Sequence, residues 1–437
     1  MPRARRETTS KTTTRAGREP TLTRAVRPLA LLLSLAAFAC EPSLPPENQA
    51  NPTILIPRLA QAHTADEQLA TLDSLSGLAL MDVPPGAPDP VAAVRPLLES
   101  RDPVVAAKAG DLLAHWNDRA AMPGLTRLLG EKDPWIRLSA VASLQALSDP
   151  RAAGALLRAA DDPAPAVRAQ ACRALGELAR RAPDPAALRV ALRGGLSDHE
   201  GAVRAAAAEG LARVGKGEDI PALIARLEDR EPGVVGAAAQ ALGALDDPRA
   251  IDPLLSTLAG ADQGTRLAAI RALGILGAHA AVKSLLELLR DRDPVMRLAA
   301  LDALRRIGDR SAVPGILRAA GDPDARLVRR VPRALAKLYD PSDLDLFLSS
   351  LKDPDPRVRA AAAAALGLAD ERRAAAGLVG ALDDPDRRVR KNAADALGEL
   401  GGAEAVPALR RVGRDDSDLE VRNAAWFALF RLMNPNL

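Results

Sequence analysis

The chain has 437 residues, of which 48% are hydrophobic and 26% charged, so its composition favours a folded protein over a disordered one. Aromatic residues make up only 2%, which argues against base-stacking platforms for nucleic acid and against a large aromatic ligand pocket. Two cysteines and four histidines leave little material for disulfides or zinc sites, and the part of the chain after residue 39 carries a formal charge of −3, which does not favour nucleic-acid binding.

Residues 1–39 are predicted to be a signal peptide. Their basic stretch ends at Arg27, and an apolar run follows over residues 29–39 in which only Ser34 is polar. A basic region before a short apolar region is typical of secretion signals. This apolar run is too short to span a bilayer as a helix, which takes about 20 residues. We therefore expect the leader to be removed; the alternative is the unprocessed start of a soluble protein.

Cys40 directly follows the apolar run, and this arrangement resembles a bacterial lipoprotein signal. The resemblance implies that Cys40 is diacylated and becomes the new N-terminus. It would then anchor the chain to a membrane of the cell envelope, with the folded body in the periplasm or at the cell surface. Ala37 and Phe38 depart from the usual lipoprotein pattern, and residues 37–39 also fit an ordinary signal-peptidase site. The alternative is a secreted soluble protein.

Residues 40–52 are polar and Pro-rich, which suits an extended tether between a lipidated cysteine and a folded body. Residues 53–89 are predicted to form a degenerate N-terminal helix pair followed by a loop. Thr64 and Glu67 have the spacing of a capping box, ahead of leucines at helical spacing.

A 31-residue repeat fills the rest of the chain, residues 90–437. The pattern D-P-x-x-V-R-x-x-A-A-x-A-L-G-x-L-G recurs, with good copies beginning at Asp133, Asp293, Asp353 and Asp384. One leucine near the end of each copy marks the register, and eight of the ten steps between successive marks are 31 residues. The marks are Leu113, Leu144, Leu175, Leu211, Leu242, Leu273, Leu304, Leu335, Leu366, Leu397 and Leu429. The one large step contains an insertion around residues 180–195.

Each repeat is predicted to contain two helices. The second should begin at the Asp-Pro pair, because Asp is a good N-cap and Pro fits the first helical position. Gly215, Gly277, Gly308 and Gly401 follow the last leucine, where a left-handed residue commonly ends a helix. An inner glycine in many copies, such as Gly274, favours close approach between helices. One pair cannot bury its own apolar face but a stack can, so the pattern predicts an all-α, right-handed α-solenoid of about 11–12 stacked helix pairs.

The repeat resembles HEAT-like repeats, specifically the short type also found in phycobilin lyases. The resemblance covers residues 90–437; it is specific for the fold and almost silent on function. It implies that the second helices line the concave face. On that face, the residue five positions after the recurrent arginine should point away from the core. These ridge residues are Asp111, Ala142, Arg173, Glu209, Gln240, Arg271, Asp302, Arg333, Ala364, Asp395 and Phe427. Their mixed charge favours protein recognition over a nucleic-acid backbone.

The recurrent arginine is interpreted as structural, because the resemblance implies an Arg–Asp ladder between neighbouring repeats. The alternative is a row of anion-binding hooks. The residues are Arg137, Arg168, Arg204, Arg266, Arg297, Arg359, Arg390 and Arg422.

One unit departs from the repeat. It carries five basic residues within twelve positions, Arg326, Arg329, Arg330, Arg333 and Lys337, and Pro332 should kink its second helix. The cluster is a candidate site for a protein partner or an anion; the alternative is a solvated face. The last helix holds Trp426, Phe427 and Phe430, which would form either a cap over the end of the stack or a docking knob.

Taken together, these features favour a non-enzymatic, membrane-tethered scaffold of a bacterial envelope that binds a protein on its concave face. The alternatives are a lyase-like enzyme or enzyme accessory, and an anion or glycan binder that uses residues 326–337. No catalytic, cofactor-binding or metal-binding residues are predicted, since His199-Glu200 is the only His-Glu pair and the other histidines are scattered. Neither a nucleic acid nor a metal is expected as a partner, and Cys172 is expected to be a buried core thiol.

Overall fold

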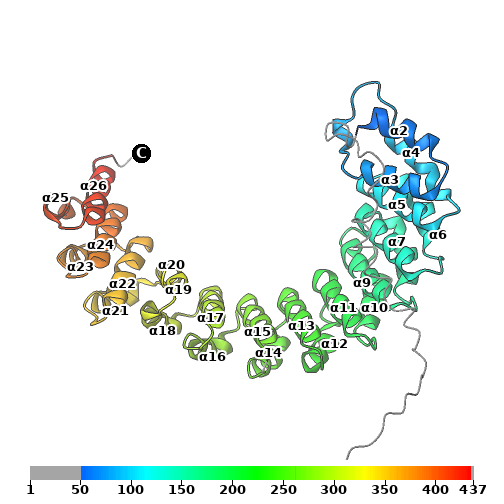
Figure 1. Ribbon diagram of the computed structural model, residues 1–437. Helices are drawn as coiled ribbons and strands as arrows, with labels where there is room; N and C mark the ends of the chain where they lie inside the picture. Colours follow the sequence, from blue (N-terminus) through cyan, green and yellow to red (C-terminus); the bar gives the residue numbers. More distant parts are fainter. Residues whose placement is uncertain (1–50, 261, 435–437) are drawn as a thin grey trace, which may run out of the picture.

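The computed structural model describes residues 51–260 and 262–434. The predicted signal peptide, Cys40 and all but the last two residues of the predicted tether lie outside these ranges. Within them every regular element is a helix or a 3₁₀ turn. The helices stack in two rows along an open arc whose two ends turn toward the same side (Figure 1). The chain is thus an α-solenoid, as the repeat predicts. None of the described helices combines the length and the apolar character that crossing a membrane requires.

The first part of the arc is irregular. It contains α2 (Pro52–Gln61), α3 (Ala65–Leu75), η3 (Leu80–Asp82), α4 (Pro90–Val94) and η4 (Arg95–Glu99). Asn51 caps α2 by accepting a hydrogen bond from the amide of Thr53. The helix therefore begins at Pro52, the last residue of the predicted tether. The capping box of α3 is present, with Thr64 and Glu67 each accepting from the other's backbone amide.

Two rows of helices form the repeating body. The inner row consists of α5 (Pro103–His115), α7 (Pro134–Leu147), α9 (Pro165–Ala179), α11 (Gly201–Val214), α13 (Pro232–Leu245), α15 (Gln263–Ile275), α17 (Pro294–Ile307), α19 (Ala325–Val328), α20 (Val331–Leu338), α22 (Pro356–Leu368), α24 (Arg387–Leu400) and α26 (Leu419–Met433). The outer row consists of α6 (Met122–Leu128), α8 (Ala153–Ala159), α10 (Ala186–Gly195), α12 (Ile220–Ala225), α14 (Ile251–Thr257), α16 (Val282–Leu288), α18 (Val313–Arg318), α21 (Leu344–Ser350), α23 (Ala375–Ala381) and α25 (Val406–Asp415). Figure 1 shows the inner row lining the concave side of the arc.

The core is one continuous apolar layer between the two rows. All the register leucines lie in it, from Leu113 at 0% exposure to Leu429 at 1%. A single cluster of buried apolar residues runs from α2 to α26, so no unit has a core of its own. Burial of each helix pair therefore depends on the pairs beside it.

Glycine allows neighbouring inner helices to approach closely. A Cβ atom on Gly274 would lie only 2.9 Å from the Cα of Ala303 in the next inner helix. Gly367 has the same relation to Ala396, at 2.7 Å. A side chain at these positions would force the backbones apart, which explains why the repeat places glycine inside a helix despite its low helix propensity.

The helix ends correct two predictions. In the copies that begin at Asp353 and Asp384, the helix does not start at that Asp-Pro pair: its N-caps are Asp355 and Asp386, two residues later. In a D-P-D run either aspartate could cap the helix. The packing of neighbouring units decides which one does. Gly215 is not left-handed either, having φ −60°; a Cβ there would lie 2.7 Å from the carbonyl oxygen of Leu211 and 3.0 Å from Leu245, so crowding by its own helix and by the next inner helix accounts for this glycine.

Candidate functional site

The recurrent arginine bridges neighbouring units. The guanidinium of Arg297 donates two hydrogen bonds to the carboxylate of Asp322, from Nε at 2.7 Å and from Nη2 at 3.0 Å. Its Nη1 donates to the backbone carbonyl of Asp291 at 2.9 Å. Both charged side chains are nearly buried, with 11% and 7% of their surfaces exposed. The arginine thus fixes its own loop and the loop of the next unit at once.

A similar ion pair recurs along the solenoid, with two hydrogen bonds to the carboxylate in every pair except that of Arg266, which has one. The pairs are Arg137–Asp162, Arg168–Asp198, Arg204–Asp229, Arg266–Asp291, Arg297–Asp322, Arg359–Asp384 and Arg390–Asp416. Each arginine reaches forward by 25 to 30 residues, into the loop between the two helices of the next pair. The hydrogen bonds from Arg204 hold the pKa of Asp229 below its usual value, so this carboxylate stays charged. With their guanidinium groups engaged, these arginines do not form an open row of anion-binding hooks.

The ladder is interrupted where the arginine is replaced. Val235 and Val328 stand at the arginine position of their units. Beside Val235 there is a hollow of about 590 Å³, whose lining combines apolar residues with four carboxylates, those of Glu228, Asp229, Asp252 and Asp262. At the end of the array, Arg422 donates to the backbone carbonyl of Asp416, and no carboxylate pairs with it within the described residues. The ladder therefore has three runs: Arg137 to Asp229, Arg266 to Asp322 and Arg359 to Arg422.

The ridge residues all lie on the inner row, and none of them is buried. Several are held by neighbours in adjacent helices. Asp111 accepts hydrogen bonds from Ser139 at 2.7 Å and Ser143 at 2.5 Å, and Arg173 and Glu209 form an ion pair at 3.4 Å. The concave face thus presents a row of exposed groups of both signs.

The basic cluster is divided by the structure. Pro332 lies at the start of α20, and the second helix of this unit is broken into α19 and α20, in line with the predicted kink. Arg326 pairs with Asp324 at 2.8 Å, and Arg330 reaches across to Asp302 of α17 at 2.6 Å. The remaining members, Arg329, Arg333 and Lys337, are exposed and make no side-chain ion pair or hydrogen bond with any described residue.

The joint at this unit is loose. From α5 to α26, α17 meets its inner neighbours α19 and α20 through the sparsest packing of the row. Arg305 stands where neighbouring copies carry the inner glycine, so the two backbones cannot approach as closely as Gly274 and Ala303 do. The missing ladder arginine, the helix break and the larger residue all weaken the contact between α17 and the helices α19 and α20.

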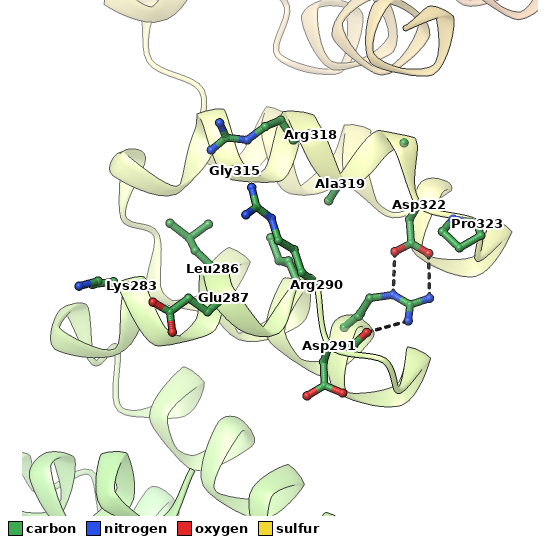
Figure 2. A pocket seen from close by; sticks show the side chains of 13 residues that line it. Lys283, Leu286, Glu287, Arg290, Asp291, Gly315, Arg318, Ala319, Asp322 and Pro323 are labelled. Carbon is green, nitrogen blue, oxygen red and sulfur yellow. Dashed lines mark hydrogen bonds and ion pairs between the residues drawn. The ribbon is translucent and has the colours of Figure 1, made fainter. Parts of the chain in front are cut away.

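Two grooves flank this region on opposite faces. The outer groove, of about 520 Å³, lies between α16 and α18. Figure 2 shows Arg290 and Arg318 extending toward each other across it, with Asp322 at one end and Lys283 and Glu287 at the other. Its cations thus share the groove with an exposed carboxylate.

The inner groove is smaller, about 390 Å³, and all its lining residues come from α15, α17 and α19. Leu267, Ile275, Val295 and Leu298 form its apolar part, and Arg271, Asp302, Arg306 and Arg326 its polar part. Sequence reasoning placed Arg271 and Asp302 on the ridge but missed the apolar members. The signal was available, since Ile275 lies one helical turn after Arg271 on the same side of the helix.

The aromatic residues of α26 lie at the open end of the stack. Trp426, Phe427 and Phe430 are 53%, 69% and 53% exposed. Trp426 and Phe430 occupy the positions that Ala394 and Gly398 hold in the preceding unit, where Gly398 contacts the next inner helix. Trp426 and Phe430 therefore lie on the face through which each preceding unit packs against the next one.

No group of His, Cys, Asp and Glu residues in the described ranges could hold a metal ion. Cys172 is 1% exposed, and burial raises the pKa of its thiol to about 11. A protonated thiol within the core lacks the thiolate form that a nucleophile or metal ligand needs.

A profile of HEAT repeats matches residues 91–176, 154–235, 220–305, 282–353 and 344–429, which together span most of the chain. No curated protein resembles the chain closely enough to count as a match.

Among solved structures, the chain is similar to yeast importin-β (Kap95p), with a TM-score of 0.55, 14% identity, and coverage of 89% of this chain and 65% of that one. It is also similar to the karyopherin Kap121p bound to Nup53p, with a TM-score of 0.54, 15% identity, and coverage of 93% of this chain and 51% of that one. The chain thus spans between half and two thirds of the length of these karyopherins, and at such identities the likeness shows the fold alone.

Proposed function

This chain belongs to the HEAT-repeat family, and from that premise we propose that it is a non-enzymatic scaffold that binds a protein partner on the concave face of its solenoid. The observation that carries the proposal is the row of ridge residues. They all lie on helices of the inner row, none is buried, and both signs of charge occur among them. A mixed row of this kind offers partner-specific ion pairs and hydrogen bonds along an extended surface, whereas a nucleic-acid backbone would require a single sign of charge.

The similar solved structures support this proposal by analogy. Kap121p has been solved with Nup53p and with the extreme C-terminus of the phosphatase Cdc14p. Those complexes concern the karyopherins themselves. They show that a solenoid with this arrangement of helices can hold another protein.

We also propose that the scaffold is tethered to a membrane of a bacterial envelope. The support is the sequence alone: a basic stretch, an apolar run over residues 29–39, Cys40 directly after it, and the Pro-rich residues that follow. Diacylation of Cys40 would place the solenoid beside the membrane, with the tether setting its reach. A single cleavage without lipidation would release the same body as a secreted protein.

Crosslinking in the native cells tests both parts. The full-length protein and a Cys40→Ala variant are crosslinked in parallel, and the attached peptides are identified by mass spectrometry. We expect one dominant protein partner attached to inner helices, and its loss when Cys40→Ala leaves the envelope membrane fraction. Attachment only to the outer helices would contradict the concave-face proposal. An unchanged membrane fraction in the variant would contradict the lipid tether.

A further inference from the structure

The inner groove between α15 and α17 has the chemistry of a site for one kind of protein segment. We propose that it binds an acidic segment of the partner that also carries an aliphatic side chain. This inference rests on the proposed scaffold function and names the class of partner for one part of the concave face. Three observations carry it: an exposed apolar floor, arginines without carboxylate partners, and the position of the groove on the inner row.

The floor of the groove is apolar and open to solvent. Ile275 at the end of α15 is 50% exposed, and Val295 near the start of α17 is 41% exposed. Leu267 and Leu298 lie between them and are half-buried. Other inner helices also expose a large apolar residue, such as Trp135 of α7 and Leu368 of α22, so the arginines beside the floor are what distinguish this groove. Covering either Ile275 or Val295 with an aliphatic side chain would remove apolar surface from water, which favours binding.

The rim of the groove carries uncompensated positive charge. Arg271 and Arg306 form no side-chain hydrogen bond or ion pair with any residue in the described ranges. The groove's own carboxylate, Asp302, is already engaged by Arg330 at 2.6 Å. Two guanidinium groups therefore remain available, and each can donate paired hydrogen bonds to a carboxylate of a partner.

The rest of the ridge differs from this groove. Arg173 is paired with Glu209, and Lys391 with Asp395 at 2.7 Å. Beyond the groove, the exposed Arg333 continues the positive surface along α20. An acidic segment that enters the groove would thus meet further free cations in one direction.

The arrangement favours a protein segment over the two other common anionic partners. The inner row lies within the concavity of the arc, where the flat surface of a bilayer does not reach (Figure 1). A nucleic-acid strand would gain little from the floor, because its lining contains no aromatic side chain on which bases stack. An acidic peptide with an aliphatic residue matches both the floor and the rim.

The outer groove supplies a matched control. Arg290 and Arg318 line it and, like Arg271 and Arg306, make no ion pair with any described residue. It lies on the convex side, and none of its lining residues is among the exposed large apolar residues. Reversing two charges there changes the net charge of the protein by the same amount as reversing two charges in the inner groove.

The test uses a random peptide library displayed on phage, selected on the purified full-length protein. We expect the enriched peptides to combine Asp or Glu with Leu, Ile or Val. Their affinity should fall by at least about tenfold in Arg271→Glu/Arg306→Glu, the loss expected when a charged hydrogen-bond partner is removed. It should also fall in Ile275→Ser, and remain within about twofold of wild type in Arg290→Glu/Arg318→Glu. Circular dichroism confirms that each variant is folded.

Several outcomes would overturn the inference. Enriched peptides that are neutral or basic would do so, as would acidic peptides whose binding is equally weakened by the outer pair, or a selection that enriches nothing. Binding to phosphatidylglycerol vesicles that depends on Arg271 and Arg306, without any acidic aliphatic peptide, would assign the groove to lipid instead. A partner crosslinked elsewhere on the inner row, unaffected by these variants, would leave the scaffold function standing while the groove assignment fails.

Discussion

Arg297 and Asp322 lie 25 residues apart in the chain, yet their side chains form a nearly buried, two-bond ion pair that joins two successive repeats. The same arginine also binds the carbonyl of Asp291, whose carboxylate accepts from Arg266 of the preceding unit. Where two successive units both carry the arginine, the aspartate loop thus receives one arginine from its own unit and one from the unit before. The ladder thus fixes the position of each loop relative to the next along the edge of the core.

Removing the arginine should destabilise the array. In Arg297→Ala the Asp322 carboxylate would remain nearly buried without its partner, and we expect a loss of about 3 kcal/mol in the free energy of unfolding. Urea unfolding followed by circular dichroism measures this loss. Partner binding should change far less than stability does. The matched control is Arg422→Ala, which has no carboxylate partner in the described part of the chain and should cost clearly less. Equal stability of wild type and Arg297→Ala would refute the structural interpretation of the ladder.

Replacing glycine by alanine should have opposite effects at two sites in the inner row of helices. In Gly274→Ala the new Cβ would lie 2.9 Å from the Cα of Ala303, so overpacking should cost about 1–3 kcal/mol. In Gly236→Ala, within α13, the new Cβ meets nothing within 4 Å, and the gain in helix propensity should add about 0.5–1 kcal/mol. Thermal unfolding of the two variants decides the point. Stabilisation by both would mean that the inner helices are not in close contact at Gly274.

The loose unit should open before its neighbours. α20 has eight residues, follows a helix break, and belongs to a unit without a ladder arginine. Few interactions must then be lost for local opening, so its amides should exchange with solvent faster than those of α17 and α22. Hydrogen exchange read by mass spectrometry gives this comparison directly. Uniform protection across α17, α20 and α22 would show that the interruption at Val328 has no mechanical consequence.

Stability should fall in acid. Hydrogen bonds from Arg151 hold the pKa of Asp149 at about 2, and hydrogen bonds from Arg373 hold that of Glu371 at about 2. Ordinary values in an unfolded chain are about 3.9 for Asp and 4.3 for Glu. The unfolded state therefore takes up protons first as the pH falls, and stabilisation present above about pH 5 is lost progressively between about pH 4 and 2.

Urea midpoints at pH 7, 5, 3.5 and 2.5 measure this dependence. Glu371→Gln should be less stable than wild type at pH 7, and the difference should shrink as the pH approaches 2, because the wild-type carboxylate then also becomes neutral. A midpoint that does not move between pH 5 and 2.5 would contradict the assignment.

The sequence alone predicts the architecture well because the repeat is local and periodic. The register leucines, the capping box at Thr64 and the left-handed glycines at 277, 308 and 401 follow from spacing within one or two turns. What depends on contact between units was harder to predict. Which aspartate of a D-P-D run caps its own helix, and which accepts the arginine of the previous unit, is decided only when two units stack. The role of Gly215 likewise depends in part on Leu245, thirty residues away.

The candidate surface was predicted only in part, for the same reason. The ridge positions follow from the helical period, but pairing among them does not. Arg330, in the broken helix of its unit, lies against Asp302, so the carboxylate that shares the groove with Arg271 and Arg306 is already engaged. In the sequence these arginines look alike. Only the fold shows which of them are paired with a carboxylate and which are not.

The central claim is that a protein binds the concave face, and site-specific photo-crosslinking tests it most directly. Benzoylphenylalanine is placed at Gln240, an exposed ridge residue of α13, and in a second variant at Ser256, an exposed residue of the outer helix α14. Both are expressed in the native cells and irradiated. Our account predicts that the variant at Gln240 captures a discrete protein partner and the variant at Ser256 does not. Capture of the same partner at Ser256 alone would contradict it.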